Sequence, residues 1–505
     1  MEALFGQMLG ALNAVFSPTI LLIMLAGTVI GIILGAMPGF GSSQALALLF
    51  PLTFTMSVDQ AVLFFLAVYS AVEYGSSIPA ILIRTPGSGA SAITVLDGYT
   101  MARNGYARKA LRISLYSGMA GGIVSTIIFI IAGTSLGHVA LMFGPSELFA
   151  VGVFGLSIVA GFFGKDAARG FLAVGIGLLL ATVGNSGFGG LRFTFEQGYL
   201  TDGIPLVVVI IAFLAGPEAF RLLVDNRRTV EDTDVNAPGK AGKDNRITPR
   251  EARELIPTIL RSSLIGTAVG IIPGAGASVA AMLAYSEEQR WSKRPEKFGT
   301  GINEGIAAPE CANNAVVAGT LVPSLALGIP GSGGAAILLG VLISKGVVPG
   351  PLLFRDNGTF VMTVFMGLLV VNVMMVIVGL IGNRPFGLVA KVPMRLLGPF
   401  VLLLIVVGAY AYANYTTHVV MVLVLAVVAY LFEKIDIPVV PIVLAFIMGP
   451  IIEENLSRAL TIAAGDISAV VLRPITLVTL VLALITAIYS IRSMLRAVRL
   501  AAASR

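Results

Sequence analysis

Long apolar stretches recur from one end of the chain to the other and constrain the fold more than any other feature. The clearest run from Pro18 to Met37, Ala110 to Ala132, Phe360 to Gly382 and Pro474 to Ile491. Each is about 20 residues long, which lets a helix cross the hydrocarbon core of a bilayer. Only 12% of the residues are charged, against about 25% in an average soluble domain. The sequence therefore predicts an all-α polytopic membrane protein with roughly ten to thirteen transmembrane helices and half-helices.

The residues that carry chemistry exclude several classes of protein. Cys311 is the only cysteine, so a disulfide within the chain is excluded and a Cys/His metal site is not expected. The chain has no G-x-x-x-x-G-K-[ST], H-E-x-x-H or G-x-S-x-G motif, so we predict no catalytic residue and no cofactor. Lys and Arg gather in short links between apolar runs, as in cytoplasmic loops of membrane proteins. The net charge of +6 therefore does not indicate nucleic-acid binding.

The longest polar interval divides the chain into two halves. It runs from Arg221 to Arg261 and mixes both charge signs with Pro and Gly, as a solvent-exposed linker does. We predict a first membrane half over residues 1–224, a polar inter-half loop over 225–255 and a second membrane half over 256–505.

Short motifs repeat in the same order in the two halves, which predicts an internal duplication. Both copies of the first motif also follow a Gly-xxx-Gly pair, Gly31/Gly35 in the first half and Gly266/Gly270 in the second. In chain order, the pairs are Pro38–Ser43 with Pro273–Ser278, Glu73–Ser77 with Glu310–Asn314, and Thr85–Ile93 with Ile329–Ile337.

Loop charge predicts that the two repeats are inverted. After the first motif, the first half has no Lys or Arg from Phe54 to Gln60, whereas the second half has four from Arg290 to Lys297. After the last motif the bias reverses, with four basic residues from Arg103 to Arg112 against only Lys345 and Arg355. Equivalent loops then lie on opposite faces of the membrane, as in inverted-topology transporters. Chance variation of charge among short loops is the alternative.

Pro-Gly within an apolar run breaks a helix, because Pro removes a donor and Gly adopts left-handed or extended conformations. Unpaired backbone groups at membrane depth are tolerated only when buried in protein or lining a wet cavity. Paired breaks in two repeats therefore predict a binding site near the midplane. The N–H groups of each restarted helix suit a carboxylate, and the freed carbonyls suit Na⁺. The alternative is that the breaks are kinks or close-packing points.

These arguments define one set of candidate substrate-binding residues and one set of candidate coupling-ion residues. Apart from Na⁺, no metal ion is expected to bind. The amides of Asn313 and Asn314 suit a carboxylate or an ion, although helix–helix hydrogen bonding would explain them equally. The predicted substrate-binding residues are Gly41, Ser42, Ser43, Pro86, Gly87, Ser88, Gly276, Ser278, Asn313, Asn314, Pro330, Gly331 and Ser332, and the predicted coupling-ion residues are Pro38, Gly39, Pro273, Gly274, Glu310 and Asn313.

Glu73 and Glu310 are acids within apolar surroundings, which is costly in lipid and indicates a function. Arg84 follows Glu73 at a spacing that returns to the same helical face, so an internal ion pair and a substrate contact both remain open. Glu147 follows Gly-Pro-Ser and is interpreted as a helix-start residue. Cys311 stands between Glu310 and the Asn pair, and we expect it beside the substrate path.

Four segments are specific enough to resemble a known family, the large membrane subunit of the tripartite tricarboxylate transporters, of the TctA type. The resemblance covers both halves. The segments are GAMPGFGSSQALALLFPLTF (Gly35 to Phe54), SSIPAILIRTPGSGASAITVLDGYTMARNG (Ser76 to Gly105), PGAGASVAAMLAYSEEQRWSKRPEKFGTG (Pro273 to Gly301) and EGIAAPECANNAVVAGTLVPSLALGIPGSGGAAILLG (Glu304 to Gly340).

The resemblance implies a multi-pass permease of the bacterial inner membrane that imports citrate or related carboxylates by Na⁺ or H⁺ symport. It implies two partners, a small membrane subunit of the TctB type and a periplasmic solute receptor of the TctC type, and an elevator-like motion. Glu73, Arg84 and Cys311 depart from the family pattern, which leaves the substrate open. Two alternatives remain: an intramembrane enzyme acting on a lipid-linked substrate, and a stand-alone carboxylate channel or exporter.

Overall fold

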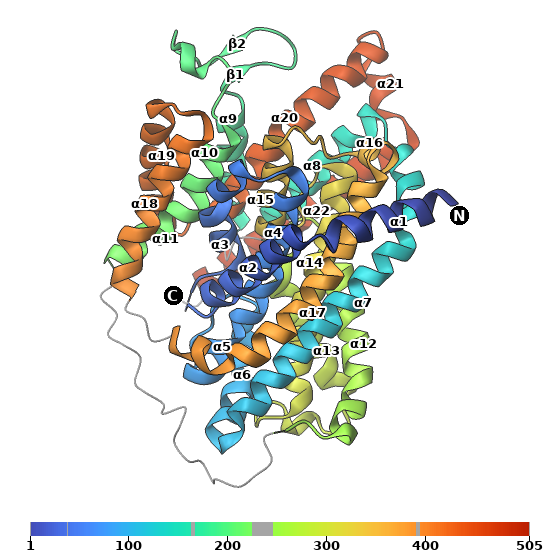
Figure 1. Cartoon of the computed structure of the whole chain (residues 1–505). Coiled ribbons are helices and arrows are strands. Elements are labelled where there is room, and N and C mark those ends of the chain that lie inside the picture. The colour runs from blue at the N-terminus through green and yellow to red at the C-terminus, as the bar shows by residue number, and fades with distance from the viewer. Residues whose placement is uncertain (1, 38, 163–166, 225–245, 390–393, 504–505) are drawn as a thin grey trace.

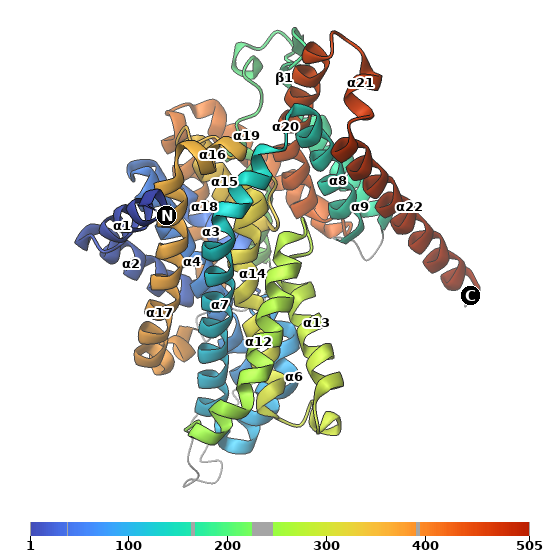
Figure 2. The same ribbon diagram turned by 90° about the vertical axis from the view of Figure 1, so that its right-hand side faces the viewer.

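The computed structural model describes residues 2–37, 39–162, 167–224, 246–389 and 394–503, and these ranges are almost entirely helical (Figures 1 and 2). Within them, the only strands are β1 (Gly184–Asn185) and β2 (Leu191–Arg192), which form one antiparallel hairpin. The α-helices are α1 Glu2–Val15, α2 Pro18–Gly35, α3 Ser42–Leu49, α4 Val58–Gly75, α5 Ser77–Ile83, α6 Ser91–Met101, α7 Ala107–Leu141, α8 Pro145–Phe162, α9 Ala167–Ala181, α10 Leu206–Ile210, α11 Gly216–Val224, α12 Pro249–Ile271, α13 Gly276–Trp291, α14 Asn303–Leu327, α15 Gly333–Ser344, α16 Pro351–Asp356, α17 Gly358–Val389, α18 Met394–Ala413, α19 Thr416–Lys434, α20 Val439–Ile462, α21 Ile467–Val471 and α22 Pro474–Ala503; 3₁₀ segments are η1 Phe50–Thr55, η3 Gly198–Leu200 and η5 Pro295–Lys297, and π segments are η2 Ala102–Tyr106 and η4 Ile211–Ala215.

The predicted all-α polytopic membrane protein is confirmed. Among the described residues, nine helical segments are long and apolar enough to cross a membrane, and several shorter apolar helices accompany them. The nine segments are Pro18–Gly35, Val58–Ile83, Ser91–Ala132, Leu206–Val224, Pro249–Ile271, Gly358–Gly382, Thr416–Lys434, Val439–Ile462 and Pro474–Arg492.

Glycines bring the first two long helices of each half into close contact. A Cβ on Gly31 of α2 would lie 2.7 Å from the carbonyl oxygen of Val68 in α4. In the second half, a Cβ on Gly270 of α12 would lie 2.8 Å from the Cα of Gly319 in α14. Small residues allow two helix backbones to approach this closely. The Gly-xxx-Gly pairs thus set the same α2–α4 and α12–α14 packing in both halves.

The four half-helices that follow the Pro-Gly breaks extend in two opposite directions (Figure 1). Lys345, at the end of α15, donates to the carbonyl oxygens of Phe54 (3.0 Å) and Met56 (2.7 Å), where η1 continues α3. At the other end of the molecule, Tyr285 of α13 donates to Asp97 of α6 (2.8 Å). Thus α3 runs with α15, and α6 with α13. Because α3 corresponds to α13, and α6 to α15, the two repeats are inverted.

The basic loops of both halves meet at one end of the molecule. Thr100, near the end of α6, donates to the carbonyl oxygen of Gly299, just after the basic stretch that follows α13. Lys109, at the start of α7, forms an ion pair with Glu251 at the start of α12. The charge bias from which the inversion was predicted therefore collects on a single face, as the positive-inside rule requires.

The repeat equivalence of Glu73 and Glu310 is wrong. The N–H of Thr85 donates to the carbonyl oxygen of Pro79 (3.2 Å), and that of Ile329 donates to the carbonyl oxygen of Pro323 (3.1 Å). Ile329 and Pro323 lie 244 positions after Thr85 and Pro79, respectively. The same offset relates the Pro-Gly motif that follows α5 to the one that follows α14. With this offset Glu73 corresponds to Val317 and Glu310 to Leu66, so each acid occurs in one repeat only.

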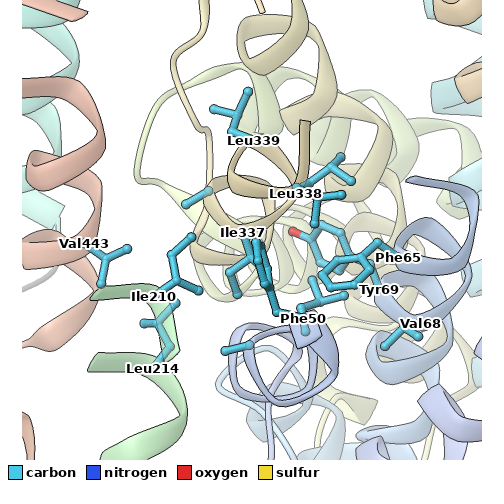
Figure 3. Packing of buried hydrophobic residues seen from close by; sticks show 14 of the residues in the cluster. Phe50, Phe65, Val68, Tyr69, Ile210, Leu214, Ile337, Leu338, Leu339 and Val443 are labelled. Carbon is cyan, nitrogen blue, oxygen red and sulfur yellow. The ribbon is translucent and has the colours of Figure 1, made fainter. Parts of the chain in front are cut away.

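Helix α15 lies at the centre of the main hydrophobic core (Figure 3). Its residues Ile337 and Leu338 pack between the aromatic side chains of Phe50 and Phe65 on one side and Ile210 of α10 on the other. The inter-half loop was predicted over residues 225–255. Residues 225–245 lie outside the described residues, and residues 249–255 belong to α12, which begins at Pro249.

A buried aspartate joins the second half-helix of the first repeat to the second repeat. Asp97 of α6 has no exposed surface, and its carboxylate accepts hydrogen bonds from the N–H groups of Gly299 (3.0 Å), Gly301 (2.8 Å) and Ile302 (3.0 Å). These residues connect α13 to α14. A single carboxylate therefore satisfies the backbone of a buried turn and holds α6 against it.

We expect Asp97→Ala to lower the free energy of unfolding by about 1–3 kcal/mol, because it leaves buried N–H groups without an acceptor. The fluorescence of Trp291, the single tryptophan, reports thermal melting of the purified protein in detergent. Asp356→Ala at an exposed site is the matched control. Equal melting temperatures for Asp97→Ala and the control would show that Asp97 does not stabilise the turn.

The inverted arrangement predicts opposite accessibility for Ser57, after η1, and Ser292, after α13. In a Cys311→Ala background, single cysteines at these positions should react with a membrane-impermeant thiol reagent from opposite sides. Labelling of intact cells, compared with labelling of inverted vesicles, measures this. Reaction of both positions from the same side would contradict the inverted topology.

Candidate functional site

The N-terminal ends of the four half-helices converge, and equivalent residues make the contacts. Added side-chain atoms on Gly333, at the start of α15, would collide with the hydroxyl of Ser43 in α3. In the same way, a Cβ on Gly89, before α6, would lie 2.5 Å from the Ser278 hydroxyl of α13. Each repeat thus places its first break against the second break of the other repeat.

Hydrogen bonds also join the two breaks within each repeat. The N–H of Gly39 donates to the carbonyl oxygen of Pro86 (3.3 Å), and the N–H of Gly274 donates to that of Gly331 (3.0 Å). Gly39 and Gly274 have φ values of +78° and +77°, which L side chains rarely adopt. The glycines of the two first motifs therefore make a turn that only glycine forms without strain.

A side chain at the N-cap position caps only one of the four half-helices. The Ser332 hydroxyl accepts a hydrogen bond from the N–H of Ala335 (3.1 Å), as an N-cap residue does. Ser42 and Ser43 instead occupy the first turn of α3, which begins after Gly41 without a side-chain cap. Their N–H groups have no intrahelical partner and remain available to a ligand.

The predicted substrate-binding residues differ in exposure. Gly41, Ser42, Ser43, Pro86, Ser88 and Gly276 are partly exposed and Ser278 is exposed, whereas Gly87, Asn313, Asn314, Pro330, Gly331 and Ser332 are buried. Of the predicted coupling-ion residues, Pro273 is partly exposed, Gly274 and Glu310 are buried, and Pro38 lies outside the described residues.

Asn313 and Asn314 of α14 face two different neighbouring helices, α4 and α7. The amide nitrogen of Asn313 lies 3.4 Å from the carbonyl oxygen of Glu73 in α4. Asn314 donates instead to the carbonyl oxygen of Glu310 (3.2 Å) and lies against Gly118 of α7. The Oδ1 atoms of both amides are buried without a hydrogen-bond partner. Only Asn313 faces an acid of the other repeat.

The two buried acids have different surroundings. The Glu310 carboxylate accepts hydrogen bonds from Thr94 of α6 and from Ser114 of α7 (3.0 Å), and the Ser114 hydroxyl lies 2.7 Å from that of Ser77. The Glu73 side chain lies near the Ser42 hydroxyl and the Asn313 amide, whose nitrogen lies 3.4 Å from the main-chain carbonyl oxygen of Glu73. Glu73 is therefore the acid adjacent to the start of a half-helix.

Two expectations about neighbouring residues are corrected. Cys311 has no exposed surface, and its Sγ lies 3.2 Å from both the Ser263 hydroxyl and the Ile259 carbonyl oxygen of α12. It packs between helices and does not line a substrate path. Arg84 is exposed and places its guanidinium over the ring of Tyr99, so it does not pair with Glu73.

Glu147 is a helix-start residue, as interpreted from the sequence. It accepts from the N–H of Gly144 (2.9 Å) and forms an ion pair with Arg473 (2.9 Å).

Sequence reasoning missed Tyr69 as a residue of this region. Its hydroxyl lies 2.8 Å from that of Ser332, so α4 of the first repeat contacts the second break of the other repeat. With the offset of 244, Tyr69 is the counterpart of Asn313. The correct repeat alignment would have revealed it, because both residues reach across to the opposite repeat.

Comparisons with known proteins identify the family of this chain. A family model described as the tripartite tricarboxylate transporter TctA family matches residues 21–444. The chain belongs to this family. An Agrobacterium vitis protein, described as an uncharacterized 52.8 kDa protein in the TAR-I ttuC' 3' region, is 33% identical over 454 residues, covering 89% of this chain and 88% of that protein.

A second Agrobacterium vitis protein, described as an uncharacterized protein in the TAR-II ttuC' 3' region, is 32% identical over 238 residues. The match covers 46% of this chain and 97% of that protein. No solved structure matches the chain.

The contacts between opposite breaks predict that bulk at Ser43 or Ser278 blocks transport. In Ser43→Leu the side chain would push against Gly333, and in Ser278→Leu against Gly89, displacing the half-helix ends. We expect uptake of the transported carboxylate to fall to background, with normal membrane insertion judged by expression and gel filtration. Ser43→Ala and Ser278→Ala are the controls for the lost hydroxyls. Normal uptake by both leucine variants would show that the breaks are only structural.

Proposed function

We propose that this TctA-family protein is the permease subunit of an ion-gradient-driven secondary transporter that imports tricarboxylates such as citrate, or related organic carboxylates. The observation that carries the proposal is the convergence of four half-helix N-termini. Each N-terminus carries about half a positive elementary charge on the N–H groups of its first turn. Together they suit a small anion with more than one carboxylate.

The site requires no cationic side chain to attract such an anion. The breaks are built from Pro, Gly and Ser, and the nearest arginine in sequence, Arg84, is turned toward Tyr99. Backbone donors at helix N-termini are fixed by the fold, so they bind an anion without losing side-chain entropy. The two pairs of half-helices point to opposite faces, which supports access to one site from either side in turn.

We infer two partners from the family, a small membrane subunit of the TctB type and a periplasmic solute receptor of the TctC type. The basic face formed by the loops after α6 and α13 would lie in the cytoplasm of a bacterium, with the chain in the inner membrane. The receptor would then deliver substrate to the opposite face. An elevator-like movement of the broken helices against the remaining helices would carry the substrate across.

Two other functions remain as alternatives. An intramembrane enzyme acting on a lipid-linked substrate would need convergent catalytic groups, and within the described ranges no group of three His, Cys, Asp or Glu could hold a metal ion. A stand-alone channel or exporter would not require the receptor. Uptake with and without the receptor separates this last alternative from the proposal.

Coupling to an ion gradient predicts a specific pattern of uptake. Proteoliposomes containing the permease and its small partner, supplied with the receptor and the carboxylate that this receptor binds in a ligand screen, should accumulate substrate when a Na⁺ or H⁺ gradient is imposed. Collapse of the gradient by an ionophore should release it. Dependence on ATP with indifference to both gradients would overturn the proposal.

A further inference from the structure

Glu73 is buried at the point where the proposed anion site begins. It lies on α4, has 2% of its surface exposed, and interacts with the hydroxyl of Ser42, the first residue of α3. Among the residues that the structure describes, no Lys, Arg or His forms an ion pair with it. A buried carboxylate without a counter-charge is costly, so this place favours a bound cation.

The neighbouring amide supplies a second unsatisfied acceptor. Asn313 is 1% exposed, its amide nitrogen lies 3.4 Å from the main-chain carbonyl oxygen of Glu73, and its Oδ1 atom has no hydrogen-bond partner. A half-turn of the amide would present this oxygen to a cation held by the carboxylate. A carboxylate, an amide oxygen and the Ser42 hydroxyl are hard oxygen ligands, and carbonyl oxygens freed at helix breaks complete such sites in transporters.

We propose that Glu73, with Asn313 and Ser42, binds Na⁺ as the coupling ion directly beside the substrate anion. The inference rests on the proposed function for the identity of the anion, but the ion site itself does not. An anion at the start of α3 and an unpaired Glu73 carboxylate would repel each other. Na⁺ between them turns this repulsion into attraction, so each ligand increases the affinity for the other by the same factor.

Within the described ranges, the side chains that α2, α3 and α14 place near Glu73 include no cation. Helix α2 presents glycines toward α4, α14 presents Asn313 and Glu310, and α3 presents Ser42. One turn away on α4 itself, the hydroxyl of Tyr69 is engaged by Ser332 of α15. Glu310 adds negative charge nearby, which strengthens the attraction for Na⁺.

The asymmetry of the repeats supports a single site of this kind. The counterpart of Glu73 in the second repeat is Val317, which is buried in the hydrophobic core. The breaks themselves are duplicated, but this acid is not. The fold therefore provides two similar pairs of helix breaks but only one acid at the position of Glu73. This predicts one Na⁺ beside the shared anion site.

Na⁺ binding to the purified permease tests the site without any substrate. Because a ligand of the native state raises the melting temperature by mass action, titration with NaCl against KCl at constant ionic strength yields an apparent Kd for Na⁺. We expect Glu73→Gln to raise this Kd about tenfold or more. Glu73→Asp should retain a weaker Na⁺ response. Glu147→Gln, which changes a carboxylate paired with Arg473, should behave as the unaltered protein.

The outcomes separate the inference from the proposed function. Equal Na⁺ responses in Glu73→Gln and the unaltered protein would overturn the Na⁺ site, as would an unaltered protein stabilised equally by Na⁺ and K⁺. If the melting temperature of the unaltered protein depends on pH instead of on Na⁺, and that of Glu73→Gln does not, Glu73 carries a proton and the Na⁺ proposal is wrong. If Na⁺ binds as expected and citrate neither lowers the Kd for Na⁺ nor is transported, the tricarboxylate function fails while the ion site stands.

Discussion

Backbone hydrogen bonding inside a membrane governs this structure, since every N–H and C=O group at that depth must find a partner. Four Pro-Gly breaks release such groups where half-helices begin. Some are satisfied between the breaks, as Gly39 with Pro86 and Gly274 with Gly331. The N–H groups in the first turn of α3 are not, and Ser43 holds them against the start of α15. The proposed site consists of these donors, which the fold leaves for a ligand.

Inversion of the repeats determines how these donors are arranged. Two parallel repeats would place equivalent helix ends on one side, whereas inverted repeats bring α3 and α15 together on one side and α6 and α13 on the other. All four N-termini then meet between the two faces. The glycine contacts of α2 with α4 and of α12 with α14 keep the breaks close to their long helices. Close packing and the proposed anion site therefore have a common origin in the duplication.

The sequence predicted the breaks and the inversion because Pro-Gly and loop charge are local signals that do not depend on packing. It failed where the direction of a side chain mattered. Helix α14 is buried on all sides from Gly305 to Ala326, so no polar face distinguishes one neighbour from another. Cys311, Asn313 and Asn314 are consecutive or nearly so, yet they face α12, α4 and α7. The sequence alignment of the two repeats was also shifted by about two helical turns at this point, so it matched Glu73 with Glu310 although the two acids occupy different places in the fold.

The two buried acids break the symmetry of the repeats, and the proposed ion coupling depends on this break. Duplicated positions such as Ser43 and Ser278 make the proposed site nearly symmetric, and a symmetric set of helix N-termini attracts anions of any kind. Glu73 and Glu310 occur where the other repeat has Val317 and Leu66. A negative charge added beside an anion site opposes binding unless a cation accompanies the substrate. If Glu73 binds Na⁺ as proposed, departures from repeat symmetry, rather than the repeated motifs, are the positions that set coupling to a cation.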